Sequence, residues 1–147
     1  MGKRRRAREL ALQFLYQYDT LMEFSPEDTN IEETLRLFWA TKETPLEDDV
    51  REFSDRLIVG ACDNIKGIDE IIDRYSEHWR LSRMSRIDKN ILRMAIYELV
   101  YFGDIPPPVT INEAVELAKK YGTEESGAFV NGILDRIRMS LTKGEIG

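Results

Sequence analysis

Apolar residues recur at steps of three and four along almost the whole chain, and this period predicts helices. In residues 5–22 this spacing places the apolar residues in one stripe along a helix. The stripe consists of Ala7, Leu10, Ala11, Phe14, Tyr18 and Leu21. A polar loop over 25–30 follows, and Ile31 begins a short second helix. Because no stretch alternates with the period of a strand, we expect an all-α protein of about seven helices.

A third helix is predicted over residues 44–66, with Thr44 as its N-cap and Pro45 in its first turn. Gly67 is expected to interrupt it before a short helix resumes. The connector 77–85, which contains Trp79, then divides the chain. We therefore expect one compact domain made of two small helical bundles, one spanning about 1–76 and the other about 77–147.

The second bundle is predicted to contain three helices. Residues 86–102 are apolar on most sides, so this helix should be central. Thr110 and Glu113 form a capping-box pattern at the start of the next helix, and Gly122 suits a left-handed helix end. The last helix, 123–143, has a predicted core face of Val130, Ile133, Leu134, Ile137 and Leu141.

Positive charge is concentrated at the start of an acidic chain. The sequence holds 21 Lys and Arg against 27 Asp and Glu, a net charge of −6. Five of the cations fall within the first eight residues, with no acid among them: Lys3, Arg4, Arg5, Arg6 and Arg8. Arginine clusters bind phosphate, and these continue directly into an apolar helical pattern. We therefore hypothesise that the first helix binds single-stranded RNA or DNA.

Tyr16 adds a second indication for that helix. On a helical wheel it lies almost opposite Ala7, on a polar face with Arg5, Glu9 and Gln13. An aromatic ring beside Arg and Gln is typical of surfaces that stack on unpaired bases. The alternative, that Tyr16 packs on a neighbouring helix, stays open at this point.

The composition disfavours several other classes of protein. One cysteine, Cys62, and one histidine, His78, provide neither a disulfide framework nor a zinc site, and they fit the reducing cytoplasm. No phosphate-binding loop, dinucleotide fingerprint or nucleophile–base arrangement occurs. The longest apolar runs are much shorter than the roughly 20 residues that span a bilayer. We expect no enzymatic activity, no metal, no cofactor and no membrane segment.

Three stretches resemble the NusB family of bacterial transcription antitermination factors. They are "RRRARELALQFLYQ" (4–17), "RIDKNILRMAIYELVY" with "DIPPPVTINEAVELAKKYG" (86–122), and "EESGAFVNGILDRI" (124–137). The resemblance implies an all-helical RNA-binding factor that is not an enzyme. It would bind boxA RNA of ribosomal transcripts together with NusE, a small-subunit ribosomal protein. With NusA and NusG it would act on RNA polymerase to suppress premature termination.

The resemblance also implies roles for particular residues. RNA contacts are implied for Arg4, Arg5, Arg6, Arg8, Gln13, Tyr16, Glu125 and Phe129. Periodicity alone favours a core position for Phe129, at the edge of the last helix's stripe. A carboxylate repels phosphate, so Glu125 would tune binding. Asp88 is implied in binding NusE, although an acid in a first turn also stabilises the helix dipole.

Two other functions remain as alternatives. The chain could be a protein–protein adaptor whose basic start binds nothing specific. It could also be an RNA-recruiting helical module for a separate RNA methyltransferase, since similar helical domains occur fused to such enzymes. Whether the chain self-associates as a homodimer through its RNA-binding face is also open.

Overall fold

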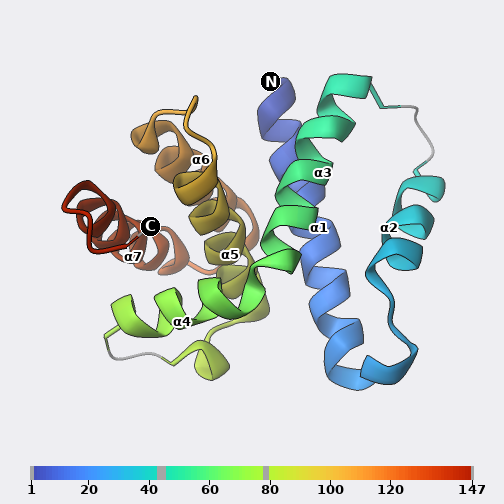
Figure 1. Ribbon diagram of the computed structural model, residues 1–147, viewed down its shortest axis with the longest axis horizontal. Helices are drawn as coiled ribbons and strands as arrows, with labels where there is room; N and C mark the ends of the chain where they lie inside the picture. The colour runs from blue at the N-terminus through green and yellow to red at the C-terminus, as the bar shows by residue number, and fades with distance from the viewer. Residues whose placement is uncertain (1, 43–45, 78–79, 147) are drawn as a thin grey trace. The chain divides into compact units, whose positions relative to one another are not determined.

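The computed structural model describes residues 2–42, 46–77 and 80–146, and Figure 1 shows its helices. Thr44, Pro45, His78 and Trp79 lie outside these residues. Seven α-helices and two short 3-10 helices, with no strand, make up the regular structure of the described ranges, which confirms the all-α prediction. They are α1 (Lys3–Phe24), η1 (Pro26–Asp28), α2 (Ile31–Ala40), α3 (Asp48–Asp63), α4 (Ile65–Tyr75), η2 (Leu81–Arg83), α5 (Arg86–Tyr101), α6 (Pro107–Tyr121) and α7 (Ser126–Thr142).

The chain divides into two compact units, Met1–Ile58 and Val59–Gly147. The division falls inside α3, so the last turn of that helix belongs to the second unit. The sequence instead suggested two bundles that meet near residue 76, and that boundary stays a prediction.

In the first unit, α1 is buried around most of its circumference between residues 7 and 15. The predicted stripe is buried there, and so are Leu12 and Leu15 from outside it. Glu9 is only 3% exposed, so its predicted place on a polar face is wrong. Ser54 of α3 donates a hydrogen bond to the Ala7 carbonyl oxygen at 2.7 Å, which fixes α3 against α1.

The break between α3 and α4 lies at Asn64, and Gly67 sits inside α4, so the predicted interruption at Gly67 is wrong. The Asn64 side-chain amide donates to the Gly60 carbonyl oxygen at 2.8 Å and caps the end of α3. Gly60 itself is needed for packing, because a Cβ atom there would overlap the ring of Tyr97. That ring is fixed by its stack on Tyr101, with centroids 4.7 Å apart.

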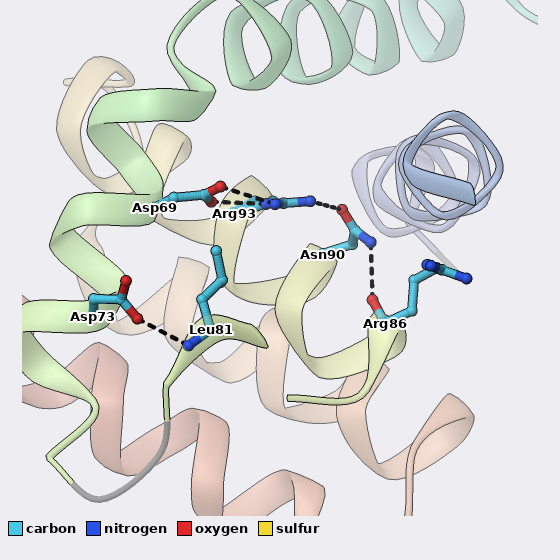
Figure 2. A network of polar contacts seen from close by, with 6 residues as sticks. All are labelled: Asp69, Asp73, Leu81, Arg86, Asn90 and Arg93. Atoms are coloured by element: carbon cyan, nitrogen blue, oxygen red, sulfur yellow. Dashed lines mark hydrogen bonds and ion pairs between the residues drawn. The ribbon is translucent and has the colours of Figure 1, made fainter. Parts of the chain in front are cut away.

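In the second unit, α5 packs against α4, α6 and α7, which confirms its predicted central position (Figure 1). Its apolar residues Ile91, Leu92, Met94, Ala95 and Ile96 are almost fully buried. Polar side chains are buried beside them. Arg93 donates to Asp69 of α4 and to Asn90, and Asn90 donates to the Arg86 carbonyl oxygen (Figure 2). This network ties α4 to α5 without an exposed charge pair.

The start of α6 differs from the prediction. The helix begins at Pro107, so Thr110 lies inside it and cannot form the predicted capping box with Glu113. Proline at the first positions of a helix is favoured because its missing N–H would have no partner there. The Thr110 hydroxyl is buried and donates instead to the Glu98 carboxylate of α5.

The passage from α6 to α7 also differs. Gly122 has φ −97°, so its predicted left-handed conformation is wrong. A Cβ atom at this position would meet the Ser126 side chain and lie 2.8 Å from the Ala118 carbonyl oxygen. The glycine therefore allows a close approach rather than a special backbone angle. The predicted core face of α7 is buried at Val130, Ile133, Leu134 and Ile137 and half-buried at Leu141.

Candidate nucleic-acid interface

The first turn of α1 combines positive charge with the positive end of a helix dipole. Gly2 is its N-cap and gives no side-chain hydrogen bond, and the first turn holds no acid. By contrast, α2 and α3 begin with the acids that a helix N-terminus favours. Mutual repulsion and the dipole both disfavour cations at this end of α1. A bound anion would relieve both effects.

Lys3 lies between two carboxylates of the same unit. Its Nζ lies 2.7 Å from Oε2 of Glu47 and 3.2 Å from Oδ2 of Asp49. The hydrogen bond from Lys3 lowers the pKa of the Asp49 carboxyl, and the two acids raise the pKa of Lys3. Arg4, Arg5 and Arg6 are exposed.

Arg8 differs from the three arginines before it, because only 4% of it is exposed. Its guanidinium carbon lies 5.3 Å from the centre of the Phe53 ring in α3. Arg4 lies over the same ring, at 5.0 Å. Phe53 therefore supports two arginines of α1 by cation–π contact. Phe53 is itself buried, and nothing in its sequence spacing indicates these contacts with the arginines of α1.

The rest of the predicted α1 surface is only partly assembled. Gln13 and Tyr16 are exposed, with 41% of Tyr16 accessible, as a base-stacking role requires. Glu9 is buried and does not share that surface. The exposed part of the predicted set on α1 therefore consists of Arg4, Arg5, Arg6, Gln13 and Tyr16.

The second unit brings together the other three predicted site residues. Asp88, Glu125 and Phe129 line one hollow of about 350 Å³, together with Arg83, Met84, Ser85, Thr123 and Ser126. Phe129 is half-buried, which fits its predicted place at the edge of the α7 stripe. Sequence spacing does not indicate that Asp88, implied in protein binding, shares a hollow with two residues implied in RNA binding.

Asp88 has a structural role at the start of α5. Its backbone N–H donates to Oγ of the N-cap Ser85 at 3.1 Å, and its charge lies in the first turn. However, its Oδ1 atom is shielded from solvent and accepts no hydrogen bond from the described residues. A buried acceptor without a donor is costly, so this atom is suited to receive a donor from outside the chain.

Two other features of the described ranges bear on the kind of site. Within them, no His, Cys, Asp and Glu side chains cluster in threes where a metal ion could be held. None of the helices found there is long and apolar enough to cross a membrane.

The chain is similar in sequence to known proteins over most of its length. The sequence profile of the NusB family matches residues 5–139. The transcription antitermination protein NusB of Thermodesulfovibrio yellowstonii is 49% identical over 138 residues, which cover 92% of this chain and 91% of that protein. The NusB of Trichlorobacter lovleyi is 51% identical over 137 residues, covering 93% and 91%.

Solved structures are similar over almost the whole chain. A crystal form of T. maritima NusB has a TM-score of 0.81 and 42% identity, covering 99% of each chain. A chain from the crystal structure of antitermination factors NusB and NusE in complex with dsRNA has a TM-score of 0.78 and 29% identity, covering 95% of this chain and 98% of that one. The sequence match and the shared fold lead to one conclusion: the chain belongs to the NusB family.

Proposed function

We propose that this chain is a non-enzymatic antitermination factor that binds boxA-type single-stranded RNA through the start of α1. The observation that carries the proposal is the trio of exposed arginines, Arg4, Arg5 and Arg6, on a helix end with no acid in its first turn. Phosphate groups would neutralise this charge, and backbone phosphates supply much of the affinity for nucleic acids. Gln13 and Tyr16 would contact bases farther along the helix.

Arg8 takes a different part in this proposal. Because it is buried against Phe53, it would orient Arg4 and the first turns of α1 and would touch RNA little. Within the second unit, Phe129 would stack on a base and Glu125 would tune the binding. A relative of the same fold was crystallised with NusE and double-stranded RNA, which supports RNA as a ligand while leaving the strand preference to be measured.

We further propose that NusE binds next to Asp88. A ribosomal protein is basic, and this chain is acidic outside its first turns, so opposite potentials would steer the encounter. The unpaired Oδ1 of Asp88 would accept a hydrogen bond from the partner. The complex would act with NusA and NusG on RNA polymerase, in the cytoplasm where transcripts are made.

The test is fluorescence anisotropy with a labelled boxA RNA and a scrambled RNA, with and without NusE, over a series of salt concentrations. We expect a preference for boxA that increases when NusE is present. The log–log salt dependence should have a slope of roughly −0.7 for each phosphate contacted on a single strand. Equal binding of the two RNAs, even with NusE, would contradict the proposal and favour an adaptor with a non-specific basic start.

The same anisotropy series should include a boxA duplex, so that single-stranded and double-stranded RNA can be compared. Self-association of the protein should be measured separately, at increasing protein concentration. Stronger binding of the single strand supports base stacking by Tyr16 and Phe129, whereas a preference for the duplex would contradict that role. If the protein forms a homodimer through its RNA-binding face, RNA should dissociate the dimer as it binds. Sedimentation velocity with and without RNA measures this.

A further inference from the structure

Gly132 lies inside α7, at a position where packing does not require a glycine. A Cβ atom there would have one neighbour within 4 Å among the described residues outside its own helix backbone, the Nη1 atom of Arg136 at 3.8 Å. Gly127 of the same helix differs, because its Cβ atom would lie 3.2 Å from the Lys119 side chain of α6. Glycine is among the least favourable residues in a helix interior. The bare backbone at Gly132 therefore indicates that a ligand approaches it from outside the chain.

Gly132 belongs to a strip along α7 that also contains Phe129 and Arg136. With 3.6 residues per turn, Gly132 lies roughly 60° and Arg136 roughly 20° around the helix from Phe129. Phe129 is half-buried, and the Arg136 side chain is 41% exposed. The Arg136 guanidinium reaches back along the helix as far as Gly132. The α7 strip thus presents an aromatic ring, a bare backbone and a cation in that order, and Glu125 lies one turn before the ring.

The Arg136 guanidinium is held through one of its edges. Its Nε atom donates a hydrogen bond to the Tyr75 carbonyl oxygen at the end of α4, at 3.1 Å. Both residues belong to the second unit. The two terminal nitrogens donate to no acceptor among the residues that the structure describes. The guanidinium is therefore oriented before any ligand binds, and its outer edge is available.

One acid faces Arg136. Oε1 of Glu77 lies 4.0 Å from the Arg136 Nε atom, so the two charges partly compensate each other. Both side chains are exposed, and exposed ion pairs contribute little to stability because water screens them. Asp135, the acid next to Arg136 in sequence, is bonded to Arg138 at 2.9 Å. What favours a phosphate contact here is the oriented outer edge of the guanidinium, because the charges around it are balanced.

We infer that the α7 strip binds one nucleotide of the RNA. The base lies on Phe129, the sugar crosses the backbone at Gly132, and the adjoining phosphate accepts parallel hydrogen bonds from the terminal nitrogens of Arg136. Guanidinium groups are well matched to phosphate in this geometry. The inference rests on the proposed stacking of a base on Phe129 and adds Gly132 and Arg136 to that contact.

The first test adds a side chain to the strip. Gly132→Leu should leave the melting temperature unchanged or raise it, because leucine favours a helix much more than glycine does. The same variant should bind a labelled single-stranded boxA RNA at least about fivefold more weakly in anisotropy titrations, as if one stacked base were lost. Thr142→Leu, at an exposed position of α7 outside the strip, is the control and should leave the affinity unchanged. Unchanged RNA binding by Gly132→Leu would overturn the inference.

The second test compares Arg136→Gln with Arg138→Gln as the matched control. The Arg138 side chain is 39% exposed, and it lies roughly 160° around α7 from Arg136. For Arg136→Gln we expect the salt slope to become shallower by about 0.7, with a loss of affinity of roughly fivefold at 0.1 M salt. Arg138→Gln should leave the slope unchanged.

Thermal melting distinguishes a phosphate contact from a structural role, because Arg136→Gln also removes the hydrogen bond to Tyr75. A lower melting temperature together with an unchanged salt slope would assign Arg136 a structural role alone and would contradict the phosphate contact. A shallower slope in a variant that is fully folded at the temperature of the titration supports it.

Phe129→Ala separates failure of this inference from failure of the proposed function. If Phe129→Ala weakens binding while Gly132→Leu and Arg136→Gln leave affinity and slope unchanged, the path along α7 is wrong and base stacking on Phe129 stands. If the unmodified protein binds neither boxA nor scrambled RNA at low salt, the proposed function fails, and the inference fails with it.

Discussion

The Arg93 guanidinium donates two hydrogen bonds to the Asp69 carboxylate, from Nε to Oδ1 at 2.8 Å and from Nη2 to Oδ2 at 2.9 Å (Figure 2). The Arg93 side chain is 7% exposed and that of Asp69 is 24% exposed. A third hydrogen bond runs from Nη1 to the Asn90 side-chain oxygen at 3.2 Å. The central helix of the second unit is thus joined to α4 by a charge that has little access to water.

We expect Asp69→Ala to lower the free energy of unfolding by about 3 kcal/mol, because it leaves the Arg93 charge buried without its partner. The lower end of the usual range applies, since Asp69 is partly exposed. Urea denaturation followed by circular dichroism measures the change. Glu70→Ala, at the exposed neighbouring position, is the control and should change stability by less than about 0.5 kcal/mol. Equal effects of the two variants would show that the pair contributes little.

The arginines of α1 should separate into two classes when each is changed to Gln. Arg5→Gln should weaken RNA binding and reduce the salt slope by about 0.7 while leaving the melting temperature unchanged, because Arg5 is exposed. Arg8→Gln should lower the melting temperature, because it removes a buried cation from the Phe53 ring. RNA titrations and thermal melts of both variants test this. The assignment is wrong if Arg8→Gln affects RNA binding alone.

Tyr16 and Phe129, the two rings proposed to stack on bases, should affect RNA binding, whereas the exposed ring of Phe24 should not. Stacking of one base is worth roughly 1–3 kcal/mol, so Tyr16→Ala and Phe129→Ala should each weaken binding by at least about fivefold. Phe24→Ala is the matched control on α1, since Phe24 is 74% exposed and belongs to no predicted contact. Affinity for a boxA strand is the measurement. A loss with Phe24→Ala as large as that with Tyr16→Ala would indicate a general effect on α1.

The Cys62 thiol should react slowly in the folded protein. Burial, and then the nearby Asp63 carboxylate, raise its pKa from the ordinary 9.0 to about 12. At pH 8 iodoacetamide should therefore label Cys62 much faster in urea than in buffer, because the thiolate is the reactive form. Mass spectrometry over time follows the labelling. Equal rates in both conditions would contradict the shift.

The same shift makes folding depend on pH. The folded state retains the thiol proton when the unfolded state has lost it, so the contribution to stability is complete below pH 9 and declines as pH rises toward 12. Cys62→Ser removes this titrating group. Its stability should therefore decline less than that of the unmodified protein between pH 9 and pH 11.

The central position of α5 was predictable because the helix has apolar residues on most of its sides, and such a helix is not stable with one side in water. Residues 86–102 read as apolar on most sides, and α5 is buried against three helices. The start of α6 was not predictable in the same way. Thr110 and Glu113 match a capping box, but Pro107 can begin the helix earlier, and Glu98 offers Thr110 a partner that only tertiary structure brings near.

The candidate interface was predictable as a region and not in its details. A run of arginines ahead of an apolar stripe indicates an anion-binding helix start, and the structure exposes three of them. Sequence spacing cannot distinguish Arg8 from Arg5, because the difference comes from Phe53 on another helix. The burial of Glu9 has the same origin: α1 is covered on more sides than its apolar stripe alone would require.

The contact between Gly60 and Tyr97 restricts how this chain can vary. Any side chain at position 60 would occupy the volume of the Tyr97 ring, which Tyr101 stacks against. A larger residue at position 60 is therefore tolerated only after a smaller residue has replaced Tyr97, although 36 residues of sequence lie between the two positions. In evolutionary terms substitutions at the two positions are coupled and have a fixed order, because a smaller residue at 97 must come before a larger one at 60.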